Sequence, residues 1–448
     1  MNVLQSAQGH IRTLAASETT ALVGLKVGSS VLRLASNLIL TRILAPEAFG
    51  AVGIIVSIRF VLAMVSDLGF RAFLIRNDRS DDEFLNTLWS VQLVRNILLT
   101  AVMIAGAALF ARAYGNPQLT TAVAITGLLF LFEGVAPMSM FIAERAQQIR
   151  RISIIEFVEV CLTIAFTIGA ALLMRSYWAI IVGIFAGASF RLFVSFFVLP
   201  SQRLRFKIEK DVLVELWAFS RIVIPSSIVS IFLTQTDKFL MAQSLPLEKL
   251  GLFMLATTLT LAVVEIVNLY TTRVFFPLLS QANRTEPNML KSLYYGSRLR
   301  LVCFLAFGVG GLIGGAEVLI TVLFDDRYLE ASTYLSILCL APLLRLFSFP
   351  AEQCLVVKGY IAATLTGNLF RMGWIVVLGF AAYYLSGPLA VIVVISTMEI
   401  ATLPLYWRRL SRFGILSFFK EAQIAGCALV GFAIGVAATL LMRLIFVA

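Results

Sequence analysis

Long apolar segments recur along this chain and constrain its fold more than any other feature. A helix needs about 20 apolar residues to cross a bilayer. We expect thirteen such segments, near residues 19–41, 51–73, 84–111, 120–143, 154–174, 178–199, 216–244, 250–279, 299–323, 332–356, 361–385, 388–406 and 422–446. The chain is 60% hydrophobic and its mean hydropathy is +0.93, which is more apolar surface than a soluble protein of 448 residues can bury. Because the segments are continuous rather than alternating, the sequence predicts an all-α polytopic membrane protein and not a β-barrel.

The loops between these segments differ in charge. One alternate set holds twenty basic residues: Arg12, Arg71, Arg76, Arg79, Arg145, Arg150, Arg151, Arg203, Arg205, Lys207, Lys210, Arg284, Lys291, Arg298, Arg300, Lys358, Arg408, Arg409, Arg412 and Lys420. The other set holds six: Arg42, Arg112, Arg175, Lys249, Arg327 and Arg443. The positive-inside rule therefore predicts a cytoplasmic N-terminus and an external C-terminus. Since the net charge of +11 follows from this topology, we expect no nucleic-acid partner.

The residue inventory limits the chemistry that the chain can perform. His10 is the only histidine, and the five cysteines lack the spacing of metal ligands. A G-x-x-x-x-G-K-[ST] phosphate loop is absent from the sequence, which argues against an ATPase. One histidine also rules out Ser/His/Asp and Cys/His nucleophile sets. We therefore expect no catalytic residue, no metal and no cofactor.

The first apolar segment carries a polar stripe. Lys26, Ser30, Arg33 and Asn37 follow the spacing of one helical face. A charge near the middle of a membrane helix costs about 3 kcal/mol on insertion scales, and such charges face cavities or partners rather than lipid. Similar polar residues recur in later segments: Arg59, Gln92, Arg95, Asn96, Thr234, Thr258, Asn268, Arg273 and Arg371. We therefore expect a water-filled cavity lined by several helices.

Other charged residues within the segments have two possible roles. The candidates for gates or for a coupling-ion site are Asp67, Asp237, Lys238, Glu265, Arg345 and Glu352. The sequence leaves open whether these side chains pair with cations of the cavity or bind a proton or sodium ion. Two sets could instead hold helices together: Arg345 with Glu352, seven residues apart, and Gln92 with Arg95. The glycines of "GVGGLIGG", residues 308–315, predict close packing against another helix.

A faint internal repeat divides the chain. The stretch "FGAVGIIVS" at 49 resembles "LGLFMLATT" at 250, and a shift of 201 residues pairs Gly50 with Gly251. We expect a six-helix N-terminal lobe at 1–200, a basic cytoplasmic linker at 201–215, a six-helix C-terminal lobe at 216–406, and a basic loop with an extra helix at 407–448. An even number of helices in each half predicts a parallel repeat, in which the substrate binds between the halves.

Four short stretches carry a family resemblance. "TRILAPEAFGAVG" at 41–53 and "SDLGFRAFLIR" at 66–76 resemble the signature of bacterial polysaccharide transporters, and "TDKFLMAQ" at 236 and "RVFFPLLSQ" at 273 resemble the start of the second half in that family. The family belongs to the multidrug/oligosaccharidyl-lipid/polysaccharide exporter superfamily. The resemblance implies two six-helix lobes in a V around a central cavity, here with one extra C-terminal helix. It also implies a monomer in the bacterial inner membrane that flips undecaprenyl-pyrophosphate-linked oligosaccharides of O-antigen (lipopolysaccharide), capsule or exopolysaccharide outward by alternating access.

The resemblance and the charges point to the same candidate site. Arg33, Arg59 and Arg273 are similar in position to cavity arginines of the related lipid II flippases. A pyrophosphate needs fixed cations to replace its water, and we expect Lys26, Arg33, Arg59 and Arg273 to bind it. A cation-coupled multidrug antiporter of the same superfamily is the first alternative, although it would favour an acidic cavity. The second is a membrane glycosyltransferase or polymerase acting on the same lipids, which would need larger loops with paired carboxylates.

Overall fold

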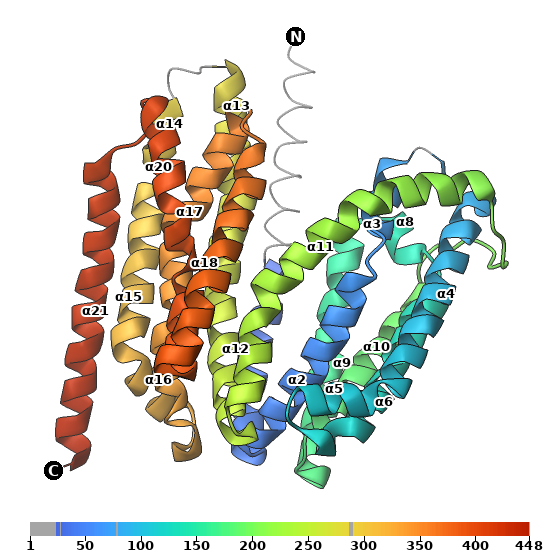
Figure 1. Ribbon diagram of the computed structural model, residues 1–448, viewed down its shortest axis with the longest axis horizontal. Coiled ribbons are helices and arrows are strands. Elements are labelled where there is room, and N and C mark those ends of the chain that lie inside the picture. The colour runs from blue at the N-terminus through green and yellow to red at the C-terminus, as the bar shows by residue number, and fades with distance from the viewer. Residues whose placement is uncertain (1–23, 27, 78, 286–289, 448) are drawn as a thin grey trace, which may run out of the picture. The chain divides into compact units, whose positions relative to one another are not determined.

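The computed structural model describes residues 24–26, 28–77, 79–285 and 290–447, and within these ranges it contains helices and no β-strand. The chain forms two compact units, Met1–Ile231 (unit 1) and Phe232–Ala448 (unit 2). In Figure 1 unit 1 runs from blue to green, and unit 2 from yellow-green to red. The boundary between the units falls inside one long helix, α11 (Lys210–Ser244), which contains Pro225.

Unit 1 contains a helix over residues 28–43 and the first part of α11. Its other elements are α2 (Pro46–Val65), α3 (Phe70–Arg76), α4 (Asp82–Ala105), α5 (Ala107–Ala113), the 3-10 helix η1 (Pro117–Leu119), α6 (Thr120–Thr126), α7 (Leu128–Val135), α8 (Ser139–Arg145), α9 (Ile149–Met174) and α10 (Trp178–Phe197). Two helices of the unit have clear start signals. Pro46 occupies the first turn of α2, and the Asp81 carboxylate accepts a hydrogen bond from Phe84 N at the start of α4.

Unit 2 begins with the rest of α11. It continues with α12 (Leu247–Tyr270), the π-helical segment η2 (Thr271–Phe275), α13 (Phe276–Thr285), α14 (Leu290–Gly296), α15 (Leu299–Leu323), the 3-10 helix η4 (Asp326–Tyr328), α16 (Ala331–Leu338), α17 (Leu340–Val357), α18 (Ala362–Ser386), α19 (Pro388–Ser396), the 3-10 helix η5 (Met398–Ala401), α20 (Leu403–Arg412) and α21 (Phe418–Val447). α12 begins 201 residues after α2, which is the shift of the sequence repeat.

The helices confirm the predicted fold class. Over the described residues, eleven helices are long and apolar enough to cross a membrane, or twelve if the bent pair Pro388–Ser396 and Met398–Arg412 counts as one span. These twelve coincide with the twelve predicted segments after the first. The first predicted segment, 19–41, begins outside the described residues and is helical at 24–26 and over 28–41. The V arrangement of two lobes stays a prediction.

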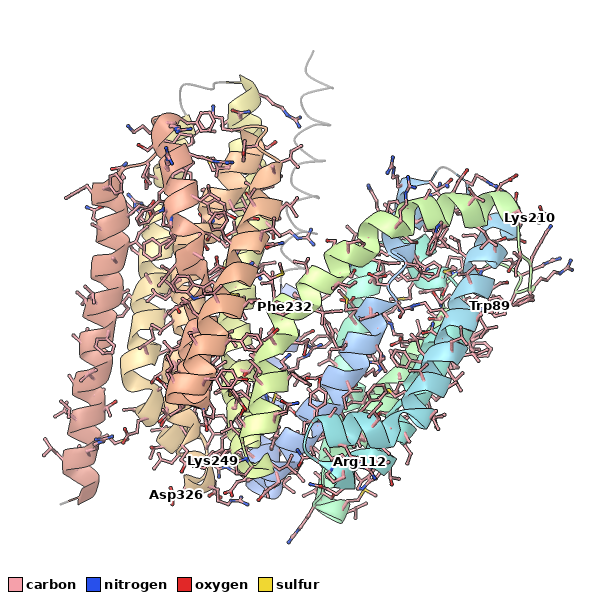
Figure 2. All side chains as sticks on the ribbon, in the orientation of Figure 1. Trp89, Arg112, Lys210, Phe232, Lys249 and Asp326 are labelled. Carbon is pink, nitrogen blue, oxygen red and sulfur yellow. The ribbon has the colours of Figure 1, made fainter. Side chains whose placement is uncertain are left out.

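Each unit separates its more basic loops from its less basic loops. In unit 1, Arg145 donates to Arg79 O over 2.6 Å, so the loops that follow α3 and α8 meet at one end. Lys210 lies at the opposite end of unit 1 from Arg112 (Figure 2). In unit 2, Lys249 and Asp326 lie at the same end (Figure 2). The separation agrees with the charge pattern of the sequence, while the direction of the chain across the membrane stays a prediction.

The extra C-terminal helix packs on α15, and Figure 1 shows α21 and α15 side by side. Glycines make this close approach possible, because a Cβ atom on Gly310 would lie 2.0 Å from Ala428 O. On α21, a Cβ on Gly435 would lie 2.5 Å from Gly311 O. The prediction that 308–315 packs closely against another helix is therefore confirmed, and α21 is its partner. The interface also has ion pairs toward both ends, Arg298 with Glu421 and Arg443 with Glu317.

Candidate functional site

One polar face of α4 organises the interior of unit 1. Gln92, Arg95 and Asn96 share this face, and Gln92 and Asn96 are 8% and 1% exposed. Arg95 donates to Ser66 O over 2.6 Å and to Ala63 O over 2.7 Å, at the point where α2 ends. The last carbonyl groups of a helix lack partners within the helix, so an arginine at this position satisfies them.

The same face of α4 satisfies the end of α7. Gln92 Nε2 donates to Glu133 O over 2.7 Å, and Trp89 Nε1 donates to Val135 O over 3.3 Å. Gln92 and Arg95 therefore hold neighbouring helices together, which is one of the two roles that the sequence left open. The polar face of α4 therefore has a structural role. It holds the C-terminal ends of α2 and α7 next to one cavity.

This cavity lies within unit 1 and has a volume of about 500 Å³. Its polar lining consists of Arg59, Asp67, Arg71, Gln92, Arg95, Asn96, Glu133, Glu159, Arg191 and Ser195. Its apolar lining includes the rings of Phe70, Phe132 and Phe141. The residues come from α2, α3, α4, α7, α8, α9 and α10 and from the turns between them, so folding of the whole unit assembles the site.

Most charges around the cavity are paired. Arg59 forms an ion pair with Glu133, and the Arg59 guanidinium lies 5.4 Å from the centroid of the Phe130 ring. Arg191 lies 3.7 Å from Glu159. At the cavity edge, Arg71 Nε donates to a carboxylate oxygen of Glu144 over 2.8 Å. Two buried atoms of the lining lack a hydrogen-bond partner among the described residues, Arg59 Nε and Asn96 Oδ1.

Three residues of the predicted sites lie on or near the first two helices of unit 1. Lys26 and Arg33 have exposed side chains on the first helical segment and do not line the cavity. Asp67 lines the cavity, but the prediction that it lies within a membrane-spanning helix is wrong. α2 ends at Val65, and the Asp67 carboxylate accepts a hydrogen bond from Gly69 N over 2.9 Å in the turn that follows. Gly69 has a φ of +71°, which glycine adopts at little cost, so the break is encoded locally.

Unit 2 contains a buried ion network. Arg371 of α18 lies 2.9 Å from Glu399 and 3.2 Å from Glu352. Arg345 of α17 lies 3.1 Å from Glu399, and the Tyr406 hydroxyl donates to Glu352 over 3.2 Å. Two arginines thus balance two glutamates, all held by neighbouring helices.

The network gives Arg345 and Glu352 one of their two possible roles, which is to hold helices together. The two residues share a face of α17, but each pairs with a different helix: Arg345 with Glu399, and Glu352 with Arg371. Glu399 was not among the residues predicted from the sequence. Its signal was a single carboxylate in an otherwise apolar segment, which is rare in membrane helices and marks a partner.

The remaining candidates for a binding, gate or ion site in unit 2, Asp237, Lys238, Glu265 and Arg273, form no salt bridge with this network. Asp237 of α11 has a buried Oδ1 without a hydrogen-bond partner among the described residues, and Lys238 Nζ donates to Gln235 over 3.3 Å. Glu265 is exposed on α12. Arg273 is exposed within the π-helical segment η2, and such segments are frequent at functional sites. The described residues contain no group of three or more His, Cys, Asp or Glu side chains placed to hold a metal.

Comparisons with known proteins give consistent results. A family described as polysaccharide biosynthesis protein matches residues 39–333. The teichuronic acid biosynthesis protein TuaB of Bacillus subtilis is 21% identical over 341 residues, which cover 70% of this chain and 68% of that protein. The succinoglycan biosynthesis transport protein ExoT of Rhizobium meliloti is 23% identical over 316 residues, 70% of this chain and 64% of that protein. The chain thus spans about two thirds of the length of these curated relatives.

Two solved structures are similar in fold. The lipid II flippase MurJ in an inward closed conformation has a TM-score of 0.71 at 13% identity, covering 95% of this chain and 100% of that one. A multidrug resistance MATE family transporter in an inward-facing conformation has a TM-score of 0.61 at 14% identity, covering 89% and 95%. At these identities the similarity establishes the fold alone.

Proposed function

Because this chain belongs to the polysaccharide biosynthesis protein family, we propose that it is a flippase for undecaprenyl-pyrophosphate-linked oligosaccharides. The family resemblance of residues 41–76 is confirmed, and the chain is a transporter rather than an enzyme. The proposed cargo is a repeat unit of O-antigen, capsule or exopolysaccharide. The proposed route leads from the cytoplasmic to the periplasmic leaflet of the bacterial inner membrane.

The presence of polar and charged groups inside helices that cross the membrane supports this proposal most directly. Unit 1 has a cavity lined by Arg59 and other polar residues, and it exposes Lys26 and Arg33 on its first helix. Unit 2 exposes Arg273 on η2. Among the described residues, Lys26, Arg33 and Arg273 form no ion pair, so their charges are available to a pyrophosphate, which binds cations through charge-assisted hydrogen bonds.

The membrane potential favours the proposed direction. A cell interior is negative, and moving one negative charge outward releases about 2.3 kcal/mol per 100 mV. A lipid pyrophosphate carries more than one negative charge, so the potential alone supplies a substantial driving force. Coupling to a proton or sodium ion would add to it.

Asp237 is our preferred residue for such coupling or for a gate, with Asp67 and Glu265 as further candidates. Its buried Oδ1 lacks a hydrogen-bond partner among the described residues, and a buried charge without a partner is costly. A proton, a sodium ion or the Lys238 ammonium in another conformation would remove that cost. Arg345 and Glu352 are fully engaged in the buried network of unit 2, so we propose that they are structural.

A multidrug antiporter fits these charges less well. A cationic drug would need carboxylates without partners, whereas Glu133 and Glu159 of the cavity are paired with arginines. The similarity to a MATE family transporter concerns the fold alone. We therefore retain the lipid-linked oligosaccharide as the proposed cargo.

Deletion of the gene tests the proposal. Cells without the protein should accumulate lipid-linked repeat units on the cytoplasmic side and lose the corresponding polysaccharide. Complementation with Arg33→Ala or Arg273→Ala should reduce export about ten- to hundredfold, the factor for losing one hydrogen bond to a charged group. Lysine at these positions should restore part of the activity, because it keeps the charge without the two-pronged geometry.

Arg42→Ala is the matched control, because Arg42 lies on the same helix as Arg33 but outside the polar stripe. It should complement fully. Normal export by both the Arg33 and Arg273 alanine variants would exclude these residues from headgroup binding. A deletion strain without accumulated lipid-linked sugars would refute the flippase proposal itself.

Thiol labelling tests the direction of transport. A cysteine introduced at Ser201 should be shielded from impermeant reagents in intact cells, and one at Gln118 should react. Both positions are exposed, so access to the reagent depends on the side of the membrane. The reverse labelling pattern would invert the topology predicted by the loop charges.

A further inference from the structure

Every arginine around the cavity of unit 1 already has a partner. Arg59 pairs with Glu133, and Arg191 pairs with Glu159. Arg71 pairs with Glu144, and Arg95 donates hydrogen bonds to the carbonyl groups at the end of α2. Asp67 adds a further carboxylate to the wall. The cavity therefore contains many charges but little net charge.

Such a cavity is poorly suited to a pyrophosphate. Pyrophosphate oxygens only accept hydrogen bonds and carry several negative charges, so they would repel the carboxylates of Glu133 and Glu159. Entry would require the breaking of existing ion pairs and would leave those carboxylates without partners in a confined space. The proposed headgroup cations Lys26, Arg33 and Arg273, which form no ion pair among the described residues, all lie outside this cavity.

Sugar hydroxyls fit the same wall well. A hydroxyl group both donates and accepts, so it can bridge a guanidinium donor and a neighbouring carboxylate acceptor. The buried atoms Arg59 Nε and Asn96 Oδ1 supply one donor and one acceptor that have no partner among the described residues. The rings of Phe132 and Phe141 supply an apolar surface for the C–H face of a sugar.

We propose that the cavity of unit 1 is a glycan subsite that binds the uncharged sugar hydroxyls of the cargo, separately from the cations that bind its pyrophosphate. This inference rests on the proposed function for the identity of the whole cargo. The volume of about 500 Å³ lies within the usual range for small-molecule sites and admits a small part of an oligosaccharide.

The subsite would make transport selective for lipids that carry sugars. A site built from hydrogen-bonding groups discriminates strongly against a ligand that lacks the matching hydroxyls, because its own polar groups then stay unpaired. A bare lipid pyrophosphate would leave the ion pairs of Glu133 and Glu159 in place and would gain nothing from the cavity. Glu133 and Glu159 are therefore specificity residues in this proposal.

Protection of an introduced cysteine tests the subsite without any transport assay. In purified full-length protein whose five native cysteines are replaced, Ala188→Cys places a thiol on the cavity wall, one helical turn before Arg191. The rate of modification by a small neutral thiol reagent is then measured with two kinds of probe. One is a panel of neutral disaccharides, and the other is inorganic pyrophosphate.

At least one disaccharide should slow the modification severalfold, and pyrophosphate should not. Glu133→Gln and Glu159→Gln should weaken this protection about tenfold or more, the loss expected for one charge-assisted hydrogen bond. Glu317→Gln is the matched control, because it breaks the ion pair with Arg443 in unit 2. It should leave the protection unchanged.

Two results would overturn the subsite: protection by pyrophosphate in place of sugars, or no protection by any disaccharide up to its solubility limit. Neither result depends on variants of the acidic residues, so misfolding of those variants cannot hide it. The outcome is also separate from that of the flippase test. If sugars protect the cysteine but the deletion strain accumulates no lipid-linked intermediates, the subsite stands and the flippase proposal is refuted. If the intermediates accumulate but no sugar protects the cysteine, the flippase proposal stands and the subsite is refuted.

Discussion

Unit 1 and unit 2 both place arginine–glutamate pairs among membrane-spanning helices, but with opposite exposure. The side chains of Arg59 and Glu133 in unit 1 are 29% and 50% exposed, whereas those of Arg371 and Glu399 in unit 2 are 6% and 1% exposed. The Arg59–Glu133 pair lines a cavity, whereas the Arg371–Glu399 pair is enclosed by side chains. The same residue types therefore line a cavity in one unit and form a buried network in the other.

The two units also differ in how many hydrogen-bonding positions of these charged groups are already occupied. In unit 2, Glu352 accepts hydrogen bonds from Arg371, Tyr406 and Thr364, so little capacity is left for a ligand. In unit 1, Arg59 keeps one nitrogen without a partner among the described residues. A carboxylate with all its partners in the protein stabilises the fold, whereas a pair with spare donors and acceptors can exchange them with a ligand.

The largest expected effect is on the stability of unit 2. Arg371→Ala would leave Glu352 and Glu399 buried with too few cations, which should lower the free energy of unfolding by about 3–5 kcal/mol. Chemical unfolding in detergent measures this quantity. An equal loss for Arg371→Ala and Arg59→Ala would remove the distinction between a structural network and a binding cavity.

A glycine next to the network should have the second largest effect. A Cβ atom on Gly367 would lie 1.8 Å from the Tyr406 hydroxyl, which reaches Glu352 across α18. We expect Gly367→Ala to lower the free energy of unfolding by about 1–3 kcal/mol, the usual cost of overpacking a core. Gly373→Ala on the same helix is the control, because nothing lies within 4 Å of its Cβ position. A similar loss in both variants would point to helix flexibility instead of contact with Tyr406.

The cavity pair should matter little for stability. Glu133→Gln removes a half-exposed ion pair, and exposed pairs contribute about 0–1 kcal/mol to the free energy of unfolding. Chemical unfolding should therefore give nearly the value of the unchanged protein, although sugar binding falls. A loss as large as that of Arg371→Ala would show that the pair is structural and would weaken the case for a glycan subsite.

An exposed cluster outside the membrane-spanning segments gives the smallest expected effect. A hydrogen bond from Arg79 lowers the pKa of Asp81 to about 2, below its ordinary value of about 3.9. Because the pKa is lower in the folded state, the contribution of Asp81 is complete above pH 4 and is lost as the pH falls toward 2. Asp81→Asn keeps an N-cap residue but removes this dependence, and unfolding measured across that pH range should detect a difference of a few tenths of a kcal/mol. An identical pH profile in both proteins would exclude the ion pair.

Spacing within one helix predicted some contacts well. Gln92 and Arg95 lie three residues apart on an apolar helix, and both hold neighbouring helices as expected. The glycines at 308–315 likewise predicted a close helix contact. In these cases the residues of one helix indicate that another helix packs against it. Polar and very small residues are favoured at helix–helix contacts and not on a surface that faces lipid.

Partner identity was less predictable. Arg345 and Glu352 share a face of α17 and were expected to hold other helices, but the sequence did not indicate that their partners are Glu399 and Arg371. Glu399 was overlooked because a single carboxylate in an apolar segment has no periodic pattern. Asp67 was assigned to a helix because the apolar run continues past the turn, although Gly69 marks the break.

The sequence by itself determined the membrane-spanning helices, their approximate limits and the segregation of basic loops, because these depend on hydrophobicity, length and charge along the chain. Only the tertiary structure decided which charges meet. Arg59 and Glu133 are 74 residues apart in the chain, and Arg345 and Glu399 are 54 apart. Pairing at such separations depends on which helices pack together and how deeply they bury each side chain, and no local pattern encodes either quantity.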